Sequence, residues 1–494
     1  MSRDLPEPAT RPYFLQGLPD DHESWLDQLG LPDGLPFLLS PRFEYDAVLN
    51  SYFFQANLLT APWNSNANRA RALARWLNFL TVARAGTSWR SATEADHLAF
   101  HQWRRRDDDG PGVMGGTWNQ EVSLVNQFYE WAVRRGYAAE VPIPQRARRP
   151  APMGSVVGGR ETGSVPATYA HDENGERIEW MTPIAYRLWR DVGLRGYGTD
   201  GLPSPRFRGR WAARNATFTD FMVRTGQRLS EQAHLTVFEI PMGSGLGGYQ
   251  RFWLPGTIAK NHSARWIYVP HSVVQELVAY LEWDRADVVE AARAAGRYQR
   301  IRRPLVIEDP QRPEVVRRWT AGSSHRLRLR DLSPAARRRL MRETPDGLEP
   351  AMLWLNEDGL PMSVSGWKAM FAAANDRCRR AGAPVAAHAH LLRHSFAVVT
   401  LEQLQRAHIA QLGELSDNQR GHYVRIFGDP LDWVRRRLGH VSVVTTLIYL
   451  HALQELEMET RMALVPDTWE DPRDTPLSEL AGDGTEAEPV RDGR

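Results

Sequence analysis

Five short segments between residues 225 and 451 hold the side chains that phosphoryl transfer to a protein nucleophile would need. Such a transfer requires a nucleophile, an acid for the departing oxygen, and cations that neutralise the non-bridging phosphate oxygens. In chain order the segments are Thr225–Glu231 with Arg228 and Glu231, the turn around Lys260, His390–His394 with Arg393 between its histidines, Leu438–His440, and Thr445–His451 with Tyr449.

Tyr449 offers the nucleophile, but its ordinary pKa of about 10 means that it needs a base or nearby positive charge. Arg228 and Arg393 present planar forks of N–H donors from different segments, so they could hold a phosphate from two sides. His390 shares a helical face with Arg393 and could accept the tyrosine proton, while His440 could donate to the phosphate. A covalent tyrosyl phosphate conserves the energy of the broken bond. We therefore expect no ATP, metal or other cofactor.

Together these segments resemble the motifs of the tyrosine recombinase (phage integrase) family. That family has an arginine in Thr-Gly-x-Arg-x-x-Glu, a lysine in a β-turn, His-x-x-Arg, Leu-Gly-His, and a tyrosine nine residues after the last histidine. Here Tyr449 lies nine residues after His440. The resemblance covers residues 180–465 and extends, through a weaker match, to residues 46–140.

The resemblance implies site-specific DNA recombination through a 3′-phosphotyrosine intermediate, with integration or excision of a mobile element as the role. Lys260 would protonate the departing 5′ oxygen. The implied partners are double-stranded DNA and three further copies of the chain, forming a tetramer on two DNA sites, with an accessory DNA-bending protein as an optional addition. The catalytic set is Arg228, Lys260, His390, Arg393, His440 and Tyr449, and the supporting residues are Glu231, which would orient Arg228, and His394.

Helical spacing of apolar residues dominates the elements that must position these side chains. It predicts helices over residues 67–83, 93–105 and 118–133, then over 182–192 and 210–225, and again from residue 270 to about 465. Three strands are expected between these helical stretches, at 233–240, 251–258 and 265–269, with Lys260 in the turn before the third.

The expected fold is mainly α with a small antiparallel β-sheet (α+β), in which two domains form a clamp on DNA. We divide the chain into an irregular arm (1–45), a helical core-binding domain of the SAM-like type (46–140), a basic linker (141–180), the catalytic domain (181–466) and an acidic tail (467–494). The segments 286–350 and 400–433 look like insertions relative to the family, and no role is assigned to them.

The net charge of +2 conceals an uneven distribution. Of the 61 basic and 59 acidic residues, residues 1–45 hold 3 and 8, and residues 467–494 hold 3 and 9, which leaves 55 and 42 for residues 46–466. A basic body between acidic ends is what a polyanionic partner would require. Only Lys260 and Lys368 are lysines, so a lysine at the position that the family needs is informative.

Several classes of protein are disfavoured by the composition. The single cysteine, Cys378, rules out an internal disulfide and a cysteine-rich metal site. No apolar run is long enough to span a membrane, and the N-terminus lacks the features of a signal peptide. We therefore expect a cytoplasmic protein without a membrane partner.

Other interpretations of the same residues stay open. Arg228 could be a surface arginine paired with Glu231, and Tyr449 could be a core aromatic residue. A type IB topoisomerase-like enzyme would use the same chemistry without exchanging partners. A catalytically inactive DNA-binding relative is a second alternative, and a metal-dependent hydrolase is a remote third. The last would use the histidines His388, His390 and His394.

Overall fold

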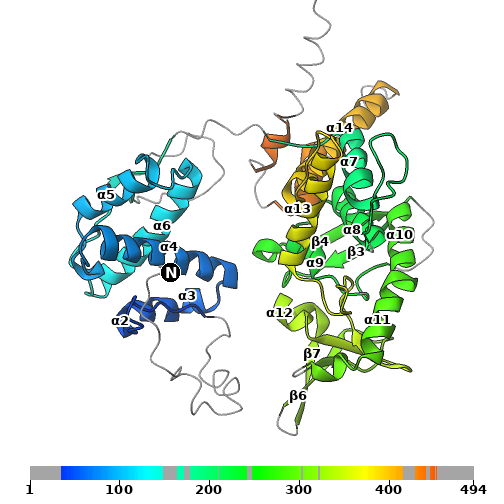
Figure 1. The fold of residues 1–494 in the computed structure, drawn as a ribbon, viewed down its shortest axis with the longest axis horizontal. Helices are drawn as coiled ribbons and strands as arrows, with labels where there is room; N and C mark the ends of the chain where they lie inside the picture. Colours follow the sequence, from blue (N-terminus) through cyan, green and yellow to red (C-terminus); the bar gives the residue numbers. More distant parts are fainter. Residues whose placement is uncertain are drawn as a thin grey trace, which may run out of the picture. The chain divides into compact units, whose positions relative to one another are not determined.

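The computed structural model describes residues 35–147, 164–171, 178–209, 211–241, 248–301, 304–320, 323–414, 429–440, 445–450 and 452. The chain divides into two compact units, Met1–Glu176 (unit 1) and Arg177–Arg494 (unit 2) (Figure 1). The expected acidic tail, most of the N-terminal arm and residues 148–163 of the expected linker lie outside the described residues.

Unit 1 is a helical domain built around an aromatic core. Its main helices are α4 (Trp63–Ala83), α5 (Glu94–Arg105) and α6 (Gly115–Arg134), preceded by the short α2 (Ala47–Asn50) and α3 (Ala56–Leu59). The three expected helices of this region are therefore confirmed. The indole of Trp76 donates to the Tyr129 hydroxyl at 2.8 Å, which donates in turn to the Trp89 carbonyl at 2.9 Å. The buried indole N–H of Trp76 and the buried hydroxyl of Tyr129 thus both have partners.

Part of the segment that was expected to be a linker packs on unit 1. Strands β1 (Gln145–Ala147) and β2 (Ser164–Pro166) form a short antiparallel pair. The next residues lie against α6, where the Trp118 indole donates to the Thr168 carbonyl at 2.7 Å and Asn119 donates to the Ala170 carbonyl at 3.0 Å. These contacts attach residues 164–170 to the helical domain.

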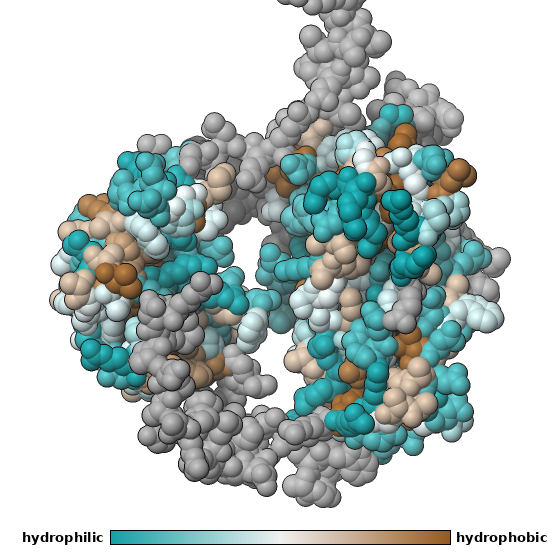
Figure 2. All heavy atoms as spheres, viewed as in Figure 1, coloured by the Kyte–Doolittle hydropathy of each residue, from teal (hydrophilic) through white to brown (hydrophobic). Residues whose placement is uncertain are grey.

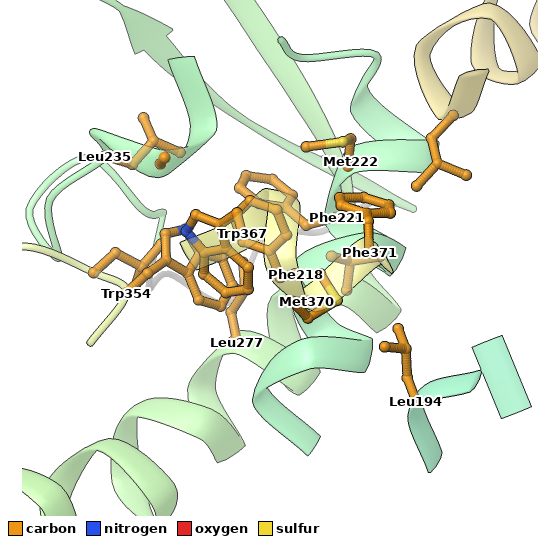
Figure 3. Close-up of a cluster of buried hydrophobic side chains, with 14 of the residues drawn as sticks. Leu194, Phe218, Phe221, Met222, Leu235, Leu277, Trp354, Trp367, Met370 and Phe371 are labelled. Carbon is orange, nitrogen blue, oxygen red and sulfur yellow. The ribbon is translucent and has the colours of Figure 1, made fainter. Parts of the chain in front are cut away.

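Unit 2 is a helical domain in which an antiparallel hairpin and a larger sheet are embedded. Its helices surround a core in which the rings of Phe218 and Trp367 stack with centroids 3.5 Å apart (Figure 3). The predicted helices over 182–192 and 210–225 correspond to α7 and α8. The helices are α7 (Pro183–Arg190), α8 (Ala212–Thr225), α9 (Leu229–Ala233), α10 (His271–Glu282), α11 (Asp284–Ala294), α13 (Val364–Arg380), α14 (Ala389–Glu414) and α16 (Pro430–Leu438), and residues 445–450 are also helical.

The hairpin consists of β3 (Tyr249–Leu254) and β4 (Arg265–Pro270), which confirms two of the three strands expected there. The prediction that residues 233–240 form a further strand of this sheet is wrong. Helix α9 extends to Ala233, and the following residues pair with a distant segment instead. Val237 donates to the Ala351 carbonyl at 2.9 Å, and Leu353 donates to the Leu235 carbonyl at 2.9 Å.

A five-stranded sheet occupies residues 305–350, where a continued helical pattern was expected. Its strands are β5 (Leu305–Ile307), β6 (Val315–Thr320), β7 (Ser323–Arg328), β8 (Leu340–Thr344) and β9 (Gly347–Pro350). The short helix α12 (Pro334–Arg337) lies between β7 and β8 in the sequence. The order is β7-β6-β5-β8-β9, and the β5–β8 pair is parallel. The general expectation of a mainly helical fold with small sheets is confirmed, but this sheet is mixed rather than antiparallel.

The surface agrees with a protein that keeps its apolar residues inside. Hydrophilic residues cover much of the visible face of unit 2, with scattered hydrophobic ones between them (Figure 2). Among the described residues, no helix combines the length and apolar character that crossing a membrane requires.

Candidate active site

Arg228 is held at the start of α9 by the sharp turn that follows α8. Helix α8 ends at Thr225 and is followed by Gly226, whose φ of 65° lies in the left-handed region. A Cβ atom at Gly226 would lie 2.3 Å from the ring of Phe396, so glycine is needed both for the turn and for the close approach of α14. Arg228 then caps α9, and its guanidinium donates to Glu231 at 3.0 Å while remaining partly exposed.

Glu231 is the fully buried anion that organises this region. It accepts hydrogen bonds from Arg228 and, at 2.6 Å, from Arg265 on β4. Burial alone would raise the pKa of Glu231, but Arg265 and Arg228 outweigh it and lower the pKa to about 2. Glu231 is therefore ionised at neutral pH, and it orients Arg228 through a charged hydrogen bond.

Arg265 is a site residue that the sequence analysis missed. Besides binding Glu231, its Nε donates to the Arg437 carbonyl at 2.9 Å, so it connects β4, α9 and α16. A Cβ atom at Gly439 would come within 3.0 Å of the Arg265 guanidinium, which explains the glycine before His440. The available signal was a charged residue on the same face of β4 as the buried Ile267 and Val269, which lie two and four positions after it.

Lys260 begins the short turn between β3 and β4. Residues Lys260–His262 form a single 3₁₀ turn in which Asn261 has a φ of 56°. The backbone N–H of Lys260 points to Glu231 at 3.4 Å, while its side chain is exposed. The lysine is thus anchored next to the carboxylate that orients Arg228, with its ammonium group free to reach a ligand.

Arg393 lies on α14 and is almost completely buried, with 1% of its surface exposed. Its guanidinium donates to the carbonyls of Gly226 and Leu438, and its Nη2 lies 3.2 Å from Nε2 of His440. Burial and then repulsion by Arg228 lower the pKa of Arg393 to about 9. Opposite charges attract more strongly where water is excluded, so this buried guanidinium is well placed to bind an anion.

His440 follows α16 and contacts both Arg393 and the segment that carries the tyrosine. Its Nδ1 lies 3.0 Å from the hydroxyl of the buried Thr446, and its ring stacks on that of Tyr449 with centroids 6.2 Å apart. Burial, followed by repulsion from Arg393, lowers the pKa of His440 to about 3. The ring is neutral at pH 7, and a phosphate that neutralised the arginines would raise its basicity.

Tyr449 lies in the same cluster, with 1% of its surface exposed. Its hydroxyl is 3.0 Å from Nδ1 of His394. Burial raises the pKa of Tyr449, and Arg393 and Arg228 act in the opposite direction. Burial and His390 lower the pKa of His394 to about 4, so this imidazole is neutral in the free protein, where it forms a hydrogen bond with the Tyr449 hydroxyl.

His390 is the residue of the predicted set whose place differs most from its assigned role. It is exposed, and its ring packs edge-on against that of His394 with centroids 4.2 Å apart. Within the described residues, the hydrogen-bond partner of the Tyr449 hydroxyl is His394. The structure therefore gathers all five sequence segments around Glu231 and Arg393, and it places His394 between His390 and the phenol.

The described part of the chain contains no group of three or more His, Cys, Asp or Glu side chains placed to hold a metal ion. The alternative site formed by His388, His390 and His394 receives no support from the geometry, since the His394 Nδ1 is engaged by Tyr449.

Lowering the pH from about 7 to about 4.5 is expected to destabilise unit 2. The pKa values of His394 and His440, about 4 and 3, lie below the 6.5 of an unfolded histidine. The unfolded chain therefore binds more protons in this range, so the stability present above pH 6.5 is lost as the pH falls. Melting temperatures measured across the range should fall less steeply for His440→Gln than for the wild type, and equal slopes would contradict the assignment.

Comparison with known proteins gives a family match in unit 1. Residues 64–136 match the family model described as the N-terminal SAM-like domain of phage integrase. These residues contain α5, α6 and all but the first residue of α4. The motifs of unit 2 indicate a resemblance to the phage integrase family, and this match confirms that the resemblance extends to residues 64–136. No curated protein matches the chain in sequence.

Several solved structures resemble the chain at low sequence identity. XerH site-specific recombinase bound to palindromic difH substrate, a post-cleavage complex, is 12% identical, with 82% of this chain and 81% of that chain covered and a TM-score of 0.44. The Tn1549 transposon integrase with transposon right end DNA is 13% identical, with 84% and 98% covered and a TM-score of 0.45. A lambda integrase dimer bound to a COC′ core site is 12% identical, with 86% and 94% covered and a TM-score of 0.38.

Proposed function

We propose that the chain is a tyrosine recombinase that cuts and rejoins DNA through a covalent bond to Tyr449. The observation on which this depends is the convergence of Arg228, Arg393, His440 and Tyr449 around one cluster, although they come from four separate segments. Two guanidinium groups and a phenol in one place match the needs of phosphoryl transfer to tyrosine.

In the first step, the phenolic oxygen of Tyr449 attacks the scissile phosphorus while the bond to the 5′ oxygen breaks. The phenolic proton passes to a neutral imidazole, for which His394 is in hydrogen-bond contact. Lys260 protonates the departing 5′ oxygen from its turn. Arg228 and Arg393 bind the non-bridging oxygens, where negative charge accumulates in the transition state.

The second step reverses the first with a new strand. The 5′ hydroxyl of a partner strand attacks the phosphotyrosine, its proton returns to Lys260, and the phenol regains a proton from the imidazole. The number of phosphodiester bonds is unchanged, so the reaction needs no external energy source. Exchange of partners requires two DNA sites, for which we propose a tetramer of this chain.

The burial of Tyr449 has a consequence for this mechanism. A phenol with 1% of its surface exposed cannot reach a phosphorus atom in a duplex without a movement of the helix at residues 445–450. We propose that this movement accompanies DNA binding, in which Arg228 and Arg393 would hold the scissile phosphate beside the phenol. The free enzyme is then a resting form.

Unit 1 supplies the second part of the proposed clamp. Its helical domain, residues 46–140, would bind the face of the duplex opposite to unit 2. This role is proposed from the family match to its central helices. Integration or excision of a mobile element is the biological role that we propose for the reaction.

The test is covalent capture from a library of nicked duplexes of random sequence, in the presence of EDTA and without ATP. Denaturation with SDS removes DNA that is only bound, and the DNA that stays attached is sequenced. We expect 3′ ends joined to protein and free 5′ hydroxyls. A plasmid with two copies of the recovered site should then recombine, whereas relaxation of supercoils alone would identify a topoisomerase. Absence of any adduct would refute the proposal.

A further inference from the structure

The hairpin of β6 and β7 in unit 2 is strongly basic. Residues 315–330 contain five arginines and no acidic residue. The antiparallel register places Arg317 opposite Arg326, and Val315 opposite Arg328. Side chains that are paired across the strands point to the same face, as do residues two apart on one strand. Arg317, Arg326 and Arg328 therefore share one face of the hairpin.

Such an arrangement costs free energy in the isolated protein. Like charges that lie directly opposite each other destabilise an antiparallel pair. Arg317 is partly compensated, because its Nε lies 2.5 Å from Glu308. Arg326 and Arg328 are exposed, and within the described residues neither has an ion-pair or hydrogen-bond partner. The face thus presents two uncompensated guanidinium groups.

The opposite face of the hairpin holds it firmly against unit 2. Val316 is fully buried in a cluster with Leu305, Ile307 and Leu329, and Leu327 packs against the same cluster. Just beyond β7, the buried guanidinium of Arg337 donates to the Leu329 carbonyl at 3.2 Å and binds Glu239 at 2.8 Å. Figure 1 shows the two strands extending from this anchored base beyond the rest of unit 2. The arginines are therefore displayed on a rigid support.

The base of the hairpin is connected to the candidate active site by two contacts. The hydroxyl of Thr257 donates to the Arg330 carbonyl at 2.7 Å, and Thr257 lies in the same β3–β4 connection as Lys260, three residues before it. On the other side, Arg337 donates to the His234 carbonyl at 3.2 Å, directly after the helix that Arg228 caps. A polyanion that reaches Lys260 would pass close to this base.

We propose that the β6–β7 hairpin is an accessory DNA-binding element whose Arg326 and Arg328 contact the phosphate backbone of the duplex beside the cleavage position. This inference rests on the proposed function. Guanidinium groups bind phosphate through paired hydrogen bonds, and residues two apart on a strand are spaced by about 6.6 Å, which suits successive anionic groups. Contacts of this kind position the duplex and do not read its sequence.

The experiment compares the double variant Arg326→Gln, Arg328→Gln with wild-type protein on a duplex of about 40 base pairs of random sequence. Loss of two phosphate contacts should raise the Kd about thirtyfold at about 0.15 M salt, and reduce the slope of log K against log salt by about 1.8. The matched control is Arg379→Gln, Arg380→Gln, which also removes two exposed arginines, at the end of α13. It should change the Kd by less than about twofold.

A second variant separates binding from folding. Arg326→Glu replaces the repulsive pair with Arg317 by an attractive one, so its melting temperature should rise while DNA affinity falls. Unchanged DNA affinity in both hairpin variants, or an equal loss in the α13 control, would overturn the proposal. So would a hairpin variant that keeps its DNA affinity but loses binding to polyglutamate, which would indicate an acidic protein partner. Failure of wild-type protein to bind duplex or form an adduct would instead refute the proposed function.

Discussion

Tyr449→Phe is expected to abolish covalent DNA adducts completely, because the lost hydroxyl is the nucleophile. Duplex affinity should change by less than about twofold, because the buried hydrogen bond to His394 contributes to folding stability, by about 1 kcal/mol, and not to DNA binding. The hydroxyl is removed without altering the packing of the ring against His440. The measurement is SDS-resistant attachment to a nicked duplex carrying the recovered site, alongside a gel-shift titration of the same DNA.

The matched control is Tyr280→Phe. Tyr280 is also buried in unit 2, where its hydroxyl donates to the Leu353 carbonyl at 3.3 Å and accepts from the Leu355 N–H at 3.1 Å. This variant should lose at least as much stability as Tyr449→Phe and keep full adduct formation. An adduct that persists in Tyr449→Phe, mapped by proteolysis to another residue, would show that the nucleophile is wrongly assigned.

Arg393→Lys is expected to slow DNA cleavage by a factor of about 10² to 10³, even though the charge is retained. A lysine cannot reproduce the fork of donors that binds Gly226, Leu438 and a phosphate at once. Two buried carbonyls would lose their partner, so we also expect the free energy of unfolding to fall by about 2 kcal/mol. The measurements are single-turnover cleavage rates and urea unfolding.

Arg285→Lys controls for the loss of stability. Arg285 is 3% exposed and its guanidinium binds the carbonyls of Pro350 and Met352, so it resembles Arg393 in burial and in partners. It lies on α11, outside the catalytic cluster, where it contacts Glu349 of β9. A similar fall in stability with a normal cleavage rate is expected for this variant. If both variants slowed cleavage equally, the effect of Arg393 would be structural.

Local patterns predicted much of this protein. Apolar residues three and four positions apart located α4, α5 and α6, because one face of each helix must enter a core. The nine-residue spacing from His440 to Tyr449 and the Thr-Gly-x-Arg segment located the candidate site through their resemblance to the motifs of a known family, since each motif is a short continuous stretch of sequence. Gly226 and Gly439 both adopt the left-handed backbone that their positions after α8 and α16 suggest.

Other features were missed because they arise between distant parts of the chain. The arginines of β6 and β7 masked the two-residue alternation that marks a strand, so residues 305–350 looked helical. Residues 233–240 have strand-like composition, but their backbone bonds go to residues 351–353, more than a hundred positions away. A strand forms its hydrogen bonds with a partner segment, and the sequence of one segment alone does not predict which segment that is.

Residue types and their order along the chain already specified the chemistry: a phenol, two guanidinium groups, a lysine and histidines suited to act on a phosphate. Packing alone determined that Arg265 joins Glu231 to α16, that His394 rather than His390 meets the phenol, and that Tyr449 is buried in the free protein. These contacts join residues that are 34 to 172 positions apart in the sequence. Their geometry depends on how α9, β4, α14 and α16 are stacked, which is set by the whole core and by no single motif.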